Sequence, residues 1–228
     1  MKNLVILTGA GISAESGIMT FRDMGGMWDQ YDIMEVASPQ GWEKDKQLVL
    51  NFYNERRKQL LNVKPNFGHT GLVDLEKEYN VQIITQNVDN LHERAGSKNI
   101  LHLHGELTKV RSTIDSALIY TLNGWELKLG DKCEKGSQLR PHIVWFGEAV
   151  PAIEEAVEIA SKADVFVVIG TSMAVYPAAN LINYTPLNCK KYLIDPNNVD
   201  VDSDVKIIKE KASKGVEILL SKLLKDRN

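Results

Sequence analysis

Short, uninterrupted runs of apolar residues alternate along the chain with segments of helical periodicity, and this alternation limits the fold more than any other feature. The apolar runs are unbroken, as strands buried on both faces of a parallel sheet are, and they span residues 4–7, 81–84, 165–169, 192–194 and 205–208. Helical spacing falls between them, over residues 45–61, 68–79, 152–160 and 215–224. The sequence therefore predicts an α/β fold with a doubly wound parallel sheet.

Two stretches interrupt this alternation and predict a smaller second lobe. Residues 25–64 are mostly loop and helix, and residues 108–138 show no strand–helix alternation, so we assign both to the small lobe. The remaining segments, 1–24, 65–107 and 139–228, then form the large domain that carries the sheet. The small lobe is thus expected to consist of two insertions into one α/β domain.

The second insertion contains the pattern of a β-hairpin. Residues 118–122 and 125–129 carry alternating apolar side chains and flank Asn123-Gly124, a pair that favours a two-residue type I′ turn. With that turn, the apolar side chains of both arms would share one face, at roughly 0.2–1 kcal/mol per cross-strand pair. We expect this hairpin to form a small hydrophobic patch.

The composition excludes several classes of protein. With 43% hydrophobic and 25% charged residues, the 228-residue chain has the make-up of an ordinary globular protein. Its formal net charge of −3 gives no electrostatic footprint for nucleic acid or an anionic membrane. No run approaches the ~20 apolar residues of a spanning helix, and the run from Leu4 is too short for a signal peptide, so we expect a cytoplasmic protein. Two distant cysteines, Cys133 and Cys189, predict no disulfide framework.

Polar side chains follow the predicted strand at 81–84, at the edge of a parallel sheet where α/β proteins hold ligands. Gln86, Asn87 and Asp89 come directly after that strand. The apolar–polar run that follows at 101–106 contains His104-Gly105. Amides, a carboxylate and a histidine at one sheet edge predict that the chemistry of the protein takes place here.

A glycine-rich turn follows the first predicted strand. The residues Gly9-Ala10-Gly11-Ile12-Ser13-Ala14 match G-x-G-x-x-A, in which glycines let the backbone approach a pyrophosphate at a helix N-terminus. A dinucleotide dehydrogenase should then show a second strand ending in an acidic residue about 20 residues later. The window at residues 24–29 is broken by glycines instead. The turn predicts nucleotide binding, and hydride transfer is disfavoured.

Several longer motifs carry a family resemblance. The segments GAGISAESGI with Phe21-Arg22, TQNVDNLHERAG, LHLHGE, RPHIVWFGE and Gly170-Thr171-Ser172 resemble, in order and spacing, those of the sirtuins, which are NAD-dependent protein lysine deacylases. The resemblance implies a Rossmann-like NAD-binding domain and a cleft beside the small lobe. It implies that NAD, as co-substrate, meets an acyl-lysine protein or peptide there and that the acyl group passes to ADP-ribose.

The resemblance also assigns roles to individual residues. It makes His104 the base that takes a proton from a ribose hydroxyl, a task suited to an imidazole with a pKa near 6.5. Asn87 and Asp89 join it as catalytic residues, whereas His102 would point to the opposite face of the strand and be structural. Ser13 is expected with Phe21 and Arg22 in a loop that closes over NAD. The residues implied to contact NAD are Gly9, Ala10, Gly11, Ile12, Ser13, Phe21, Arg22, Gln86, Asn87, Val88, Asp89, Gly170, Thr171, Ser172, Asp195, Asn197 and Ala212.

A Tyr-x-x-Arg pair indicates the acyl group. Tyr53 and Arg56 are three residues apart on a predicted helix and share a face. They resemble the sirtuin subgroup that removes malonyl, succinyl or glutaryl groups, where a guanidinium and a phenol hold the acyl carboxylate. Ala37 matches the small residue that widens the acyl pocket. The alternative is a solvated helix face with Arg56 in a weak surface ion pair.

The segment Val144-Trp145-Phe146-Gly147-Glu148 resembles the part of a sirtuin that pairs with the extended substrate peptide as an added strand. The alternative for Trp145 and Phe146 is a place in the core. All five residues are therefore expected at the substrate.

The chain departs from the family where zinc is expected. Sirtuins usually hold four cysteines in a zinc ribbon, and closed structural zinc sites need four ligands. Ser112 stands where the first cysteine would fall, and Cys133 is the only cysteine of the region. We therefore expect no metal ligands and no zinc, with the Asn-Gly hairpin in place of the metal. The family's asparagine is also missing from Asp195-Pro196, so the contacts there are less defined.

Other functions share some of these features. An ADP-ribosyltransferase on the same scaffold would bind NAD but would not need the pair Tyr53 and Arg56. A non-catalytic NAD-binding module would not need His104. Release of nicotinamide together with O-acyl-ADP-ribose would separate a deacylase from both alternatives.

Overall fold

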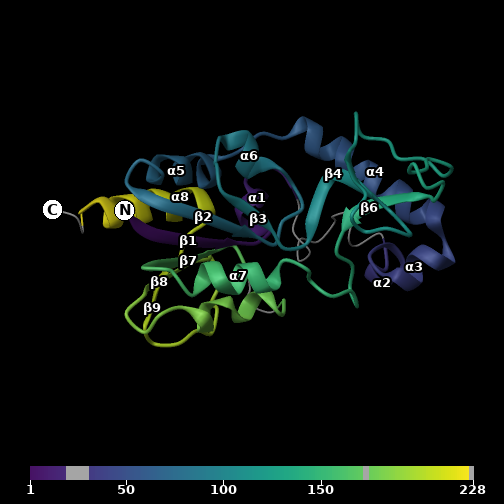
Figure 1. The fold of residues 1–228 in the computed structure, drawn as a ribbon. Helices are drawn as coiled ribbons and strands as arrows, with labels where there is room; N and C mark the ends of the chain where they lie inside the picture. The colour runs from purple at the N-terminus through teal and green to yellow at the C-terminus, as the bar shows by residue number, and fades with distance from the viewer. Residues whose placement is uncertain (19–30, 172–174, 226–228) are drawn as a thin grey trace.

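A six-stranded parallel sheet forms the centre of the large domain in the computed structural model, which describes residues 1–18, 31–171 and 175–225 (Figure 1). The strand order is β3-β2-β1-β7-β8-β9. These strands are β1 (Lys2–Thr8), β2 (Tyr79–Thr85), β3 (Ile100–His102), β7 (Val165–Ile169), β8 (Lys190–Ile194) and β9 (Val205–Ile208). The expected doubly wound α/β fold is confirmed.

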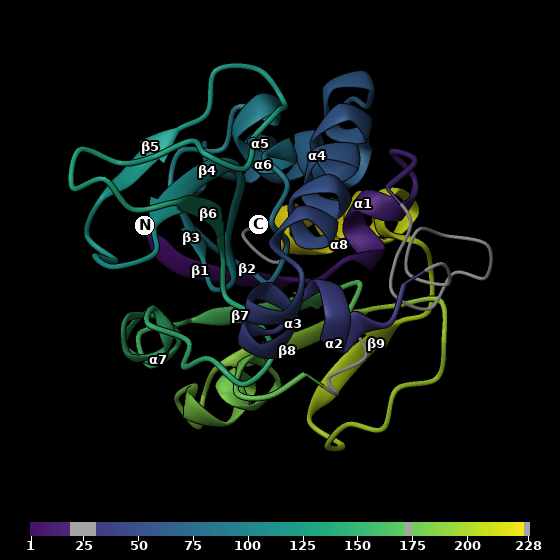
Figure 2. The same ribbon diagram turned by 90° about the vertical axis from the view of Figure 1, so that its right-hand side faces the viewer.

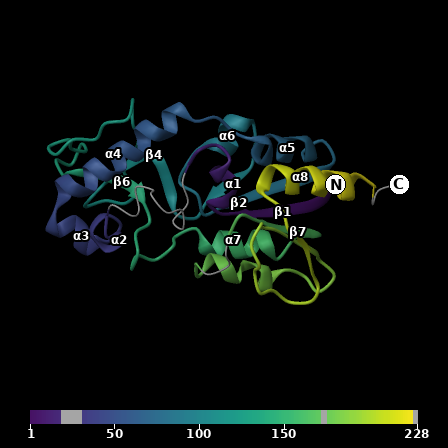
Figure 3. The ribbon, with the colours of Figure 1, turned by 180° about the vertical axis from the view of Figure 1, so that it is seen from behind.

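Helices cover both faces of this sheet, as Figures 1 and 3 show from opposite sides. Leu4 and Ile6 of β1 face a core that includes α5 (Phe67–Leu75) and α8 (Ala212–Lys225), with α1 (Gly11–Ala14) at its edge. Val5 and Leu7 face a second core against α7 (Ile153–Ala160) and the 3-10 helix η2 (Ala178–Tyr184). Burying each such side chain contributes about 1.5–3 kcal/mol, which explains why the strand is apolar on both faces.

The direction of winding changes at β1, and this brings three loops to one point. The chain passes from β1 to β2 and β3 on one side and then to β7, β8 and β9 on the other. Thr8 at the end of β1 is level with Thr85 of β2 and with Ile169 of β7. The loops that begin at Gly9, Gln86 and Gly170 therefore start side by side. Ligands of open α/β sheets bind at such a switch point, outside the carboxyl ends of the strands.

The small lobe lies at the end of the molecule opposite the two termini (Figures 1 and 3). It contains a three-stranded antiparallel sheet in the order β5-β4-β6, seen in Figure 2. Its elements are α2 (Ile33–Val36), α3 (Pro39–Lys44), α4 (Lys46–Asn62), β4 (Gly105–Ser112), β5 (Ile119–Thr121) and β6 (Leu139–Ile143), and α6 (Leu91–Ala95) lies beside it. Strand β4 begins before the insertion expected at 108–138, and strand β6 lies wholly after it.

The predicted hairpin at 118–129 is wrong. Only its first arm is a strand, β5, and it pairs with β4, with Tyr120 opposite Val110. The second arm has no strand because the α4 side chain of Asn54 occupies its backbone: Leu127 N donates to Asn54 Oδ1 over 2.9 Å, and Asn54 Nδ2 donates to Leu127 O over 3.0 Å. Leu129 is left 56% exposed instead of packing across a hairpin. The preference of Asn-Gly for a tight turn is overridden by these tertiary hydrogen bonds.

Within the ranges described, no helix combines the length and apolarity needed to cross a membrane.

Candidate active site

The glycine-rich turn after β1 is packed too closely against the loop after β7 to hold a side chain at Gly9 or Gly11. A Cβ on Gly9 would lie 2.7 Å from the Gly170 carbonyl oxygen, and a Cβ on Gly11 would lie 2.6 Å from the Gly170 Cα. Gly170 has a φ of +62°, which L side chains rarely adopt. Between residues 9 and 12, the amides of Gly9, Gly11 and Ile12 donate to carbonyl oxygens, and Ala10 N alone has no partner in the described chain. The turn thus presents one amide, and not several, to a phosphate.

The side chains of Asn87 and Asp89 meet the same turn through a buried hydrogen-bond network. Asn87 Nδ2 donates to Gly9 O over 3.1 Å and to Ser13 Oγ over 3.2 Å, and Ser13 Oγ donates to Asp89 Oδ2 over 2.9 Å. Burial raises the pKa of Asp89, while hydrogen bonds from Leu91 N and Ser13 Oγ oppose the rise. Ser13, expected in a loop over NAD, instead lies fully buried in α1 and helps to hold the two residues after β2.

His104 lies between β3 and β4, beside the residues that follow β2. Its Nδ1 is 3.0 Å from Gln86 O, and because a carbonyl only accepts, Nδ1 must carry the hydrogen. Nε2 has no hydrogen-bond partner in the part of the chain that the structure describes. Gly105 permits this placement, since its φ is +82° and a Cβ there would lie 2.0 Å from His142 O. Burial lowers the pKa of His104 despite the hydrogen bond to Gln86, so the imidazole is neutral at pH 7 with an unprotonated Nε2.

His102, which we predicted to be structural, makes different contacts from those of His104. Its Nδ1 is 3.1 Å from Asn87 O and its Nε2 is 2.7 Å from Glu93 Oε1. Burial lowers its pKa, but the hydrogen bond and the charge of Glu93 outweigh this and raise the pKa of His102. Both nitrogens therefore act as donors, and the imidazolium ties α6 to the backbone of Asn87.

Two further histidines lie beneath the site, and we did not predict them. His69 Nε2 is 3.4 Å from Ser13 Oγ, and His92 Nε2 is 3.0 Å from Thr8 Oγ1. Their rings stack edge to face with centroids 5.0 Å apart. Burial lowers the pKa of His69 to about 4 and that of His92 well below its ordinary value. The signal for His69 was its position three residues after Asn66, where its Nδ1 accepts from Asn66 N to complete a capping box.

The remaining residues expected at NAD lie along the carboxyl edge of the sheet. Gln86 Nε2 donates to Thr171 Oγ1 over 3.2 Å, which links the loops after β2 and β7. Asp195 directly follows β8 and is buried, and its Oδ1 accepts from N and Nδ2 of Asn197 over 2.9 and 3.1 Å. Ala212 is the buried first residue of α8. Asp195 and Asn197 thus bond to each other in this structure.

Three of the predicted residues, Phe21, Arg22 and Ser172, lie outside the described residues. Ile12 and Val88 are described and belong to the packing. Ile12 is fully buried in the core that α5 and α8 share, and Val88 packs against the core of the small lobe.

The Tyr-x-x-Arg pair lies on α4, and its tyrosine is part of the small-lobe core. Tyr53 is 1% exposed, and its Oη accepts a hydrogen bond of 3.0 Å from Trp145 Nε1. The Arg56 Cζ is 5.8 Å from the centroid of the Tyr53 ring. Ala37 is buried close by, and its carbonyl accepts from Phe146 N over 2.9 Å. The pair is therefore not a solvated helix face, because Tyr53 is held inside the lobe.

The segment from Val144 to Glu148 connects the Tyr53–Arg56 pair to His104. Val144 N donates to His104 O over 2.9 Å, so the backbone that follows β6 is bonded to the predicted base. A turn then closes through Glu148 N, which donates to Trp145 O over 3.0 Å, and Gly147 takes a φ of +88° in it. Trp145 is buried, whereas Phe146 is 46% exposed and faces away from the core.

Arg140 belongs with this segment and was missing from our prediction. Its Nη1 and Nη2 donate to the two carboxylate oxygens of Glu148 over 2.7 and 3.0 Å, and Nη2 also donates to Ile143 O over 3.1 Å. Its Cζ lies 3.3 Å from the centroid of the Trp145 ring. The signal was present in the sequence, because Arg140 opens the motif RPHIVWFGE.

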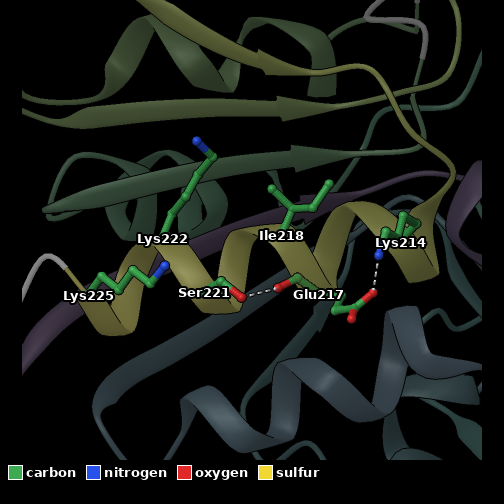
Figure 4. A pocket seen from close by; sticks show the side chains of 6 residues that line it. All are labelled: Lys214, Glu217, Ile218, Ser221, Lys222 and Lys225. Carbon is green, nitrogen blue, oxygen red and sulfur yellow. Dashed lines mark hydrogen bonds and ion pairs between the residues drawn. The ribbon is translucent and has the colours of Figure 1, made fainter.

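Two surface hollows lie away from these residues. One of about 320 Å³ runs along the exposed side of α8, where Figure 4 shows Lys214 paired with Glu217 over 2.7 Å and Ser221 bonded to Glu217 O. A second, of about 300 Å³, lies between α4 and α6 and includes Arg57 and Arg94. No residue that we predicted for the site lines either hollow.

One group of side chains in the described ranges has ligand atoms close enough for a metal, and each is already paired. Glu93, His102 and Glu106 bring theirs within 4.8 Å of one another. His102 bonds to Glu93 over 2.7 Å, and Lys109 pairs with Glu106 over 2.5 Å. In the small lobe, Cys133 Sγ is hydrogen-bonded to two serine hydroxyls, 3.3 Å from Ser112 and 3.2 Å from Ser137.

Comparison with known proteins agrees with this arrangement. The model of the Sir2 family matches residues 9–177. The chain belongs to the Sir2 family. An NAD-dependent protein deacylase of Bacteroides thetaiotaomicron is 58% identical to this sirtuin over 231 residues, which covers 98% of this chain and 99% of the relative. One from Helicobacter pylori is 56% identical over 228 residues, which covers 98% of each chain.

Solved structures support the same assignment. A Sir2 homologue in complex with NAD is similar to this sirtuin with a TM-score of 0.89 and 38% identity, over 100% of this chain and 91% of that chain. The predicted enzyme class, a sirtuin-type NAD-dependent protein deacylase, is confirmed.

Proposed function

We propose that this sirtuin removes acidic acyl groups, succinyl or malonyl, as well as acetyl, from lysine side chains of proteins and transfers them to ADP-ribose. The observation that carries the proposal is the position of Tyr53 and Arg56 on α4, beside the segment that is bonded to His104. A division into an NAD-binding domain and a small lobe, with the acyl-lysine between them, is part of the same proposal.

The residues at the switch point fit a dinucleotide. The turn at Gly9 and Gly11 has no room for side chains, and Ala10 N is left for an oxygen acceptor. Bound NAD supplies the ribose carbon that the acyl oxygen attacks as nicotinamide leaves, and it supplies the ADP-ribose that carries the acyl group away. Asn87 and Asp89, fixed by Ser13, would line the ribose and nicotinamide positions.

His104 has the properties that the base requires. Its Nδ1–H donates to Gln86 O, so the unprotonated Nε2 is the nitrogen that takes a proton from a ribose hydroxyl. The lowered pKa keeps this nitrogen unprotonated at neutral pH. A nucleophilic ribose hydroxyl then attacks the acyl carbon, and general-base assistance of this kind contributes about 10²–10⁴-fold to a rate.

The acyl pocket offers a carboxylate one charged donor and one neutral donor. Tyr53 Oη accepts from Trp145, so its own hydrogen is free of that bond, and no acceptor for it lies among the described residues. Burial raises the pKa of Tyr53, so the phenol stays protonated and able to donate. Arg56 adds a guanidinium beside the same ring. A terminal carboxylate would accept a hydrogen bond from the buried hydroxyl and pair with the charge of the Arg56 guanidinium.

The small lobe does not fit a structural zinc ion. One thiol and two hydroxyls meet where a ribbon would need four good ligands, and hydroxyls are poor zinc ligands. The hairpin expected in place of the metal is absent from the described structure, and the lobe is held by the pairing of β4 with β5 and β6. We propose that the protein folds and acts without zinc.

A comparison of two acyl peptides tests the proposal. The protein is incubated with NAD and a succinyl-lysine or an acetyl-lysine peptide of one sequence, and nicotinamide and O-acyl-ADP-ribose are followed by mass spectrometry. Arg56→Met should lower kcat/KM for the succinyl peptide about ten- to 100-fold more than for the acetyl peptide, as expected for loss of a charged hydrogen bond. Equal losses would refute the acidic specificity, and transfer of ADP-ribose to the peptide would indicate a transferase.

A further inference from the structure

Trp145 is the one described residue that hydrogen-bonds to the Tyr53 hydroxyl, although it lies 92 residues away in the sequence. Indole N–H is a donor only, so the bond of 3.0 Å fixes the direction of donation from Trp145 to Tyr53. Both side chains are 1–2% exposed, and no water competes for the bond from bulk solvent. The phenol is thus left with its hydrogen pointing away from the indole.

The indole is itself held from two sides. Arg140 lies over its ring, with Cζ 3.3 Å from the centroid, and Trp42 packs against it with a centroid distance of 5.7 Å. A cation over the ring withdraws electron density and strengthens the N–H as a donor. Arg140 cannot move freely, because its guanidinium fork bonds both oxygens of Glu148.

Glu148 links the Arg140 guanidinium to the backbone of Trp145. Its Oε2 accepts from Trp145 N over 2.8 Å, so one carboxylate fixes both the main chain of Trp145 and the cation on its ring. Arg111 Nη2 adds bonds of 3.3 Å to the same carboxylate. Burial raises the pKa of Glu148, but the bonds from Arg140 and Trp145 outweigh this and lower it, so the group stays ionised.

We propose that Trp145, held by Arg140 and Glu148, is a positioning residue for acyl selectivity that orients the Tyr53 hydroxyl toward the carboxylate of the substrate. This inference rests on the proposed acidic specificity and adds the residues that establish it. It also joins two parts of the substrate site, because the segment that carries Trp145 is the one expected to contact the peptide. Without the hydrogen bond from the indole, the hydroxyl of Tyr53 would rotate and its hydrogen would no longer point toward the substrate carboxylate.

The decisive variant is Trp145→Phe, which keeps an aromatic ring for Arg140 and Trp42 but removes the N–H. The ratio of kcat/KM for succinyl-lysine over acetyl-lysine peptide should fall about three- to tenfold, the range for one neutral hydrogen bond. The change should appear mainly in KM for the succinyl peptide, since the bond acts on bound substrate. Trp125→Phe is the matched control, because it makes the same change at an indole that lies under Lys58 and is not one of the groups that hold Trp145, and it should leave the ratio alone.

A double-mutant cycle separates positioning from packing. In a Tyr53→Phe background, Trp145→Phe should cause no further fall in the ratio, since the group that it orients is gone. A fall of equal size in both backgrounds, or an equal loss for the two acyl peptides, would overturn the inference. If Tyr53→Phe itself leaves the ratio unchanged, the proposed acidic specificity fails and the inference fails with it. If Tyr53→Phe lowers the ratio and Trp145→Phe does not, the inference fails alone.

A spectroscopic measurement adds a readout that a packing role would not move. With nitrogen-15 labelled tryptophan, the indole N–H resonance of Trp145 is assigned by its absence in Trp145→Phe. Tyr53→Phe should shift this resonance. The succinyl peptide should shift it further than the acetyl peptide does, because the ligand bonds to the hydroxyl that the indole holds; equal shifts would count against the proposal.

Discussion

Gly9 and Gly170 approach so closely at the sheet edge that not even a methyl group fits between them, whereas Tyr53 and Trp145 in the small lobe meet through one side-chain hydrogen bond of 3.0 Å. The first region is defined by backbone and by small, buried hydrogen-bonding groups. The second is defined by aromatic rings and guanidinium groups. A site formed by close backbone contacts tolerates few substitutions, whereas single substitutions can change the selectivity of a site formed by side chains.

The two regions also treat charge differently. Neutral imidazoles fill the space beneath the nucleotide side, where burial lowers the pKa values of His69, His92 and His104. On the acyl side, Arg56 places a guanidinium beside the Tyr53 ring, and Arg140 pairs with Glu148. This difference suits the two proposed tasks, since a base must be unprotonated and a pocket for a carboxylate must be positive.

The sharpest test of the nucleotide side is His104→Ala. Turnover should fall about 10²–10⁴-fold with both acyl peptides, because the same base serves either substrate. In the wild type, activity should fall as the pH drops through the lowered pKa of His104, below the ordinary value of 6.5. Nicotinamide release is measured together with the melting temperature, which should stay near that of the wild type. If His104→Ala lost activity on one acyl peptide and kept it on the other, the assignment of His104 as a base common to both substrates would be wrong.

Gly170→Ala should reveal how far the nucleotide side depends on backbone contact. A Cβ there would lie 2.5 Å from Ile12 N, and the φ of +62° disfavours alanine, so we expect a loss of about 2–5 kcal/mol in the free energy of unfolding. Gly124→Ala is the matched control, since its φ is +89° but nothing lies within 4 Å of the added Cβ. The control should cost about 1–2 kcal/mol from strain alone. Similar losses in urea unfolding would show that contact adds nothing.

The buried histidines should make the protein sensitive to acid. The pKa of His69 falls from 6.5 in the unfolded chain to about 4 in the folded one, which corresponds to about 3 kcal/mol. This stability is fully present above pH 6.5 and is lost as the pH falls toward about 4. His69→Gln should therefore flatten the pH dependence of urea unfolding in that range. His102→Gln should act in a different range, because the raised pKa of His102 contributes stability that is fully present below pH 6.5 and is lost as the pH rises through the raised pKa.

The smallest expected effect concerns metal. A chelator should leave the melting temperature and the deacylase activity unchanged, and elemental analysis of the purified protein should find no stoichiometric zinc. A marked loss of stability with the chelator would show that Cys133 and its surroundings hold an ion after all. The small lobe would then depend on a metal, and not on side-chain hydrogen bonds alone.

Some features followed from local pattern. Five apolar runs predicted five of the six strands of the large sheet, because a strand buried on both faces must be apolar throughout. The polar residues after β2 and the glycines after β1 were found for the same reason, since a ligand site in such a fold lies at the ends of its strands. The helix expected to run to residue 79 ends at Leu75, because Tyr79 is buried as the first residue of β2 and its apolar spacing matched both elements.

Other features depended on contacts between distant residues. Asn54 holds the backbone at Leu127 and prevents the hairpin, although the turn sequence favours it. His92 gave no local sign of its hydrogen bond to Thr8, and the motif that contains Arg140 did not show that its guanidinium lies over Trp145. Residues so far apart meet only after the chain has packed, so periodicity and turn chemistry carry no information about them.

The sequence by itself determined that this chain is an α/β protein with a nucleotide turn and that its polar residues gather at the strand ends, because strand burial and glycine turns leave a periodic, local trace. Only the tertiary structure decided how those residues are used: that Ser13 supports Asn87 and Asp89, that His104 spends one nitrogen on Gln86, and that Trp145 bonds to Tyr53. Hydrogen bonds between distant residues fix these roles. The residue to which each donor points is a neighbour in the folded structure only, so no local pattern in the sequence predicts it.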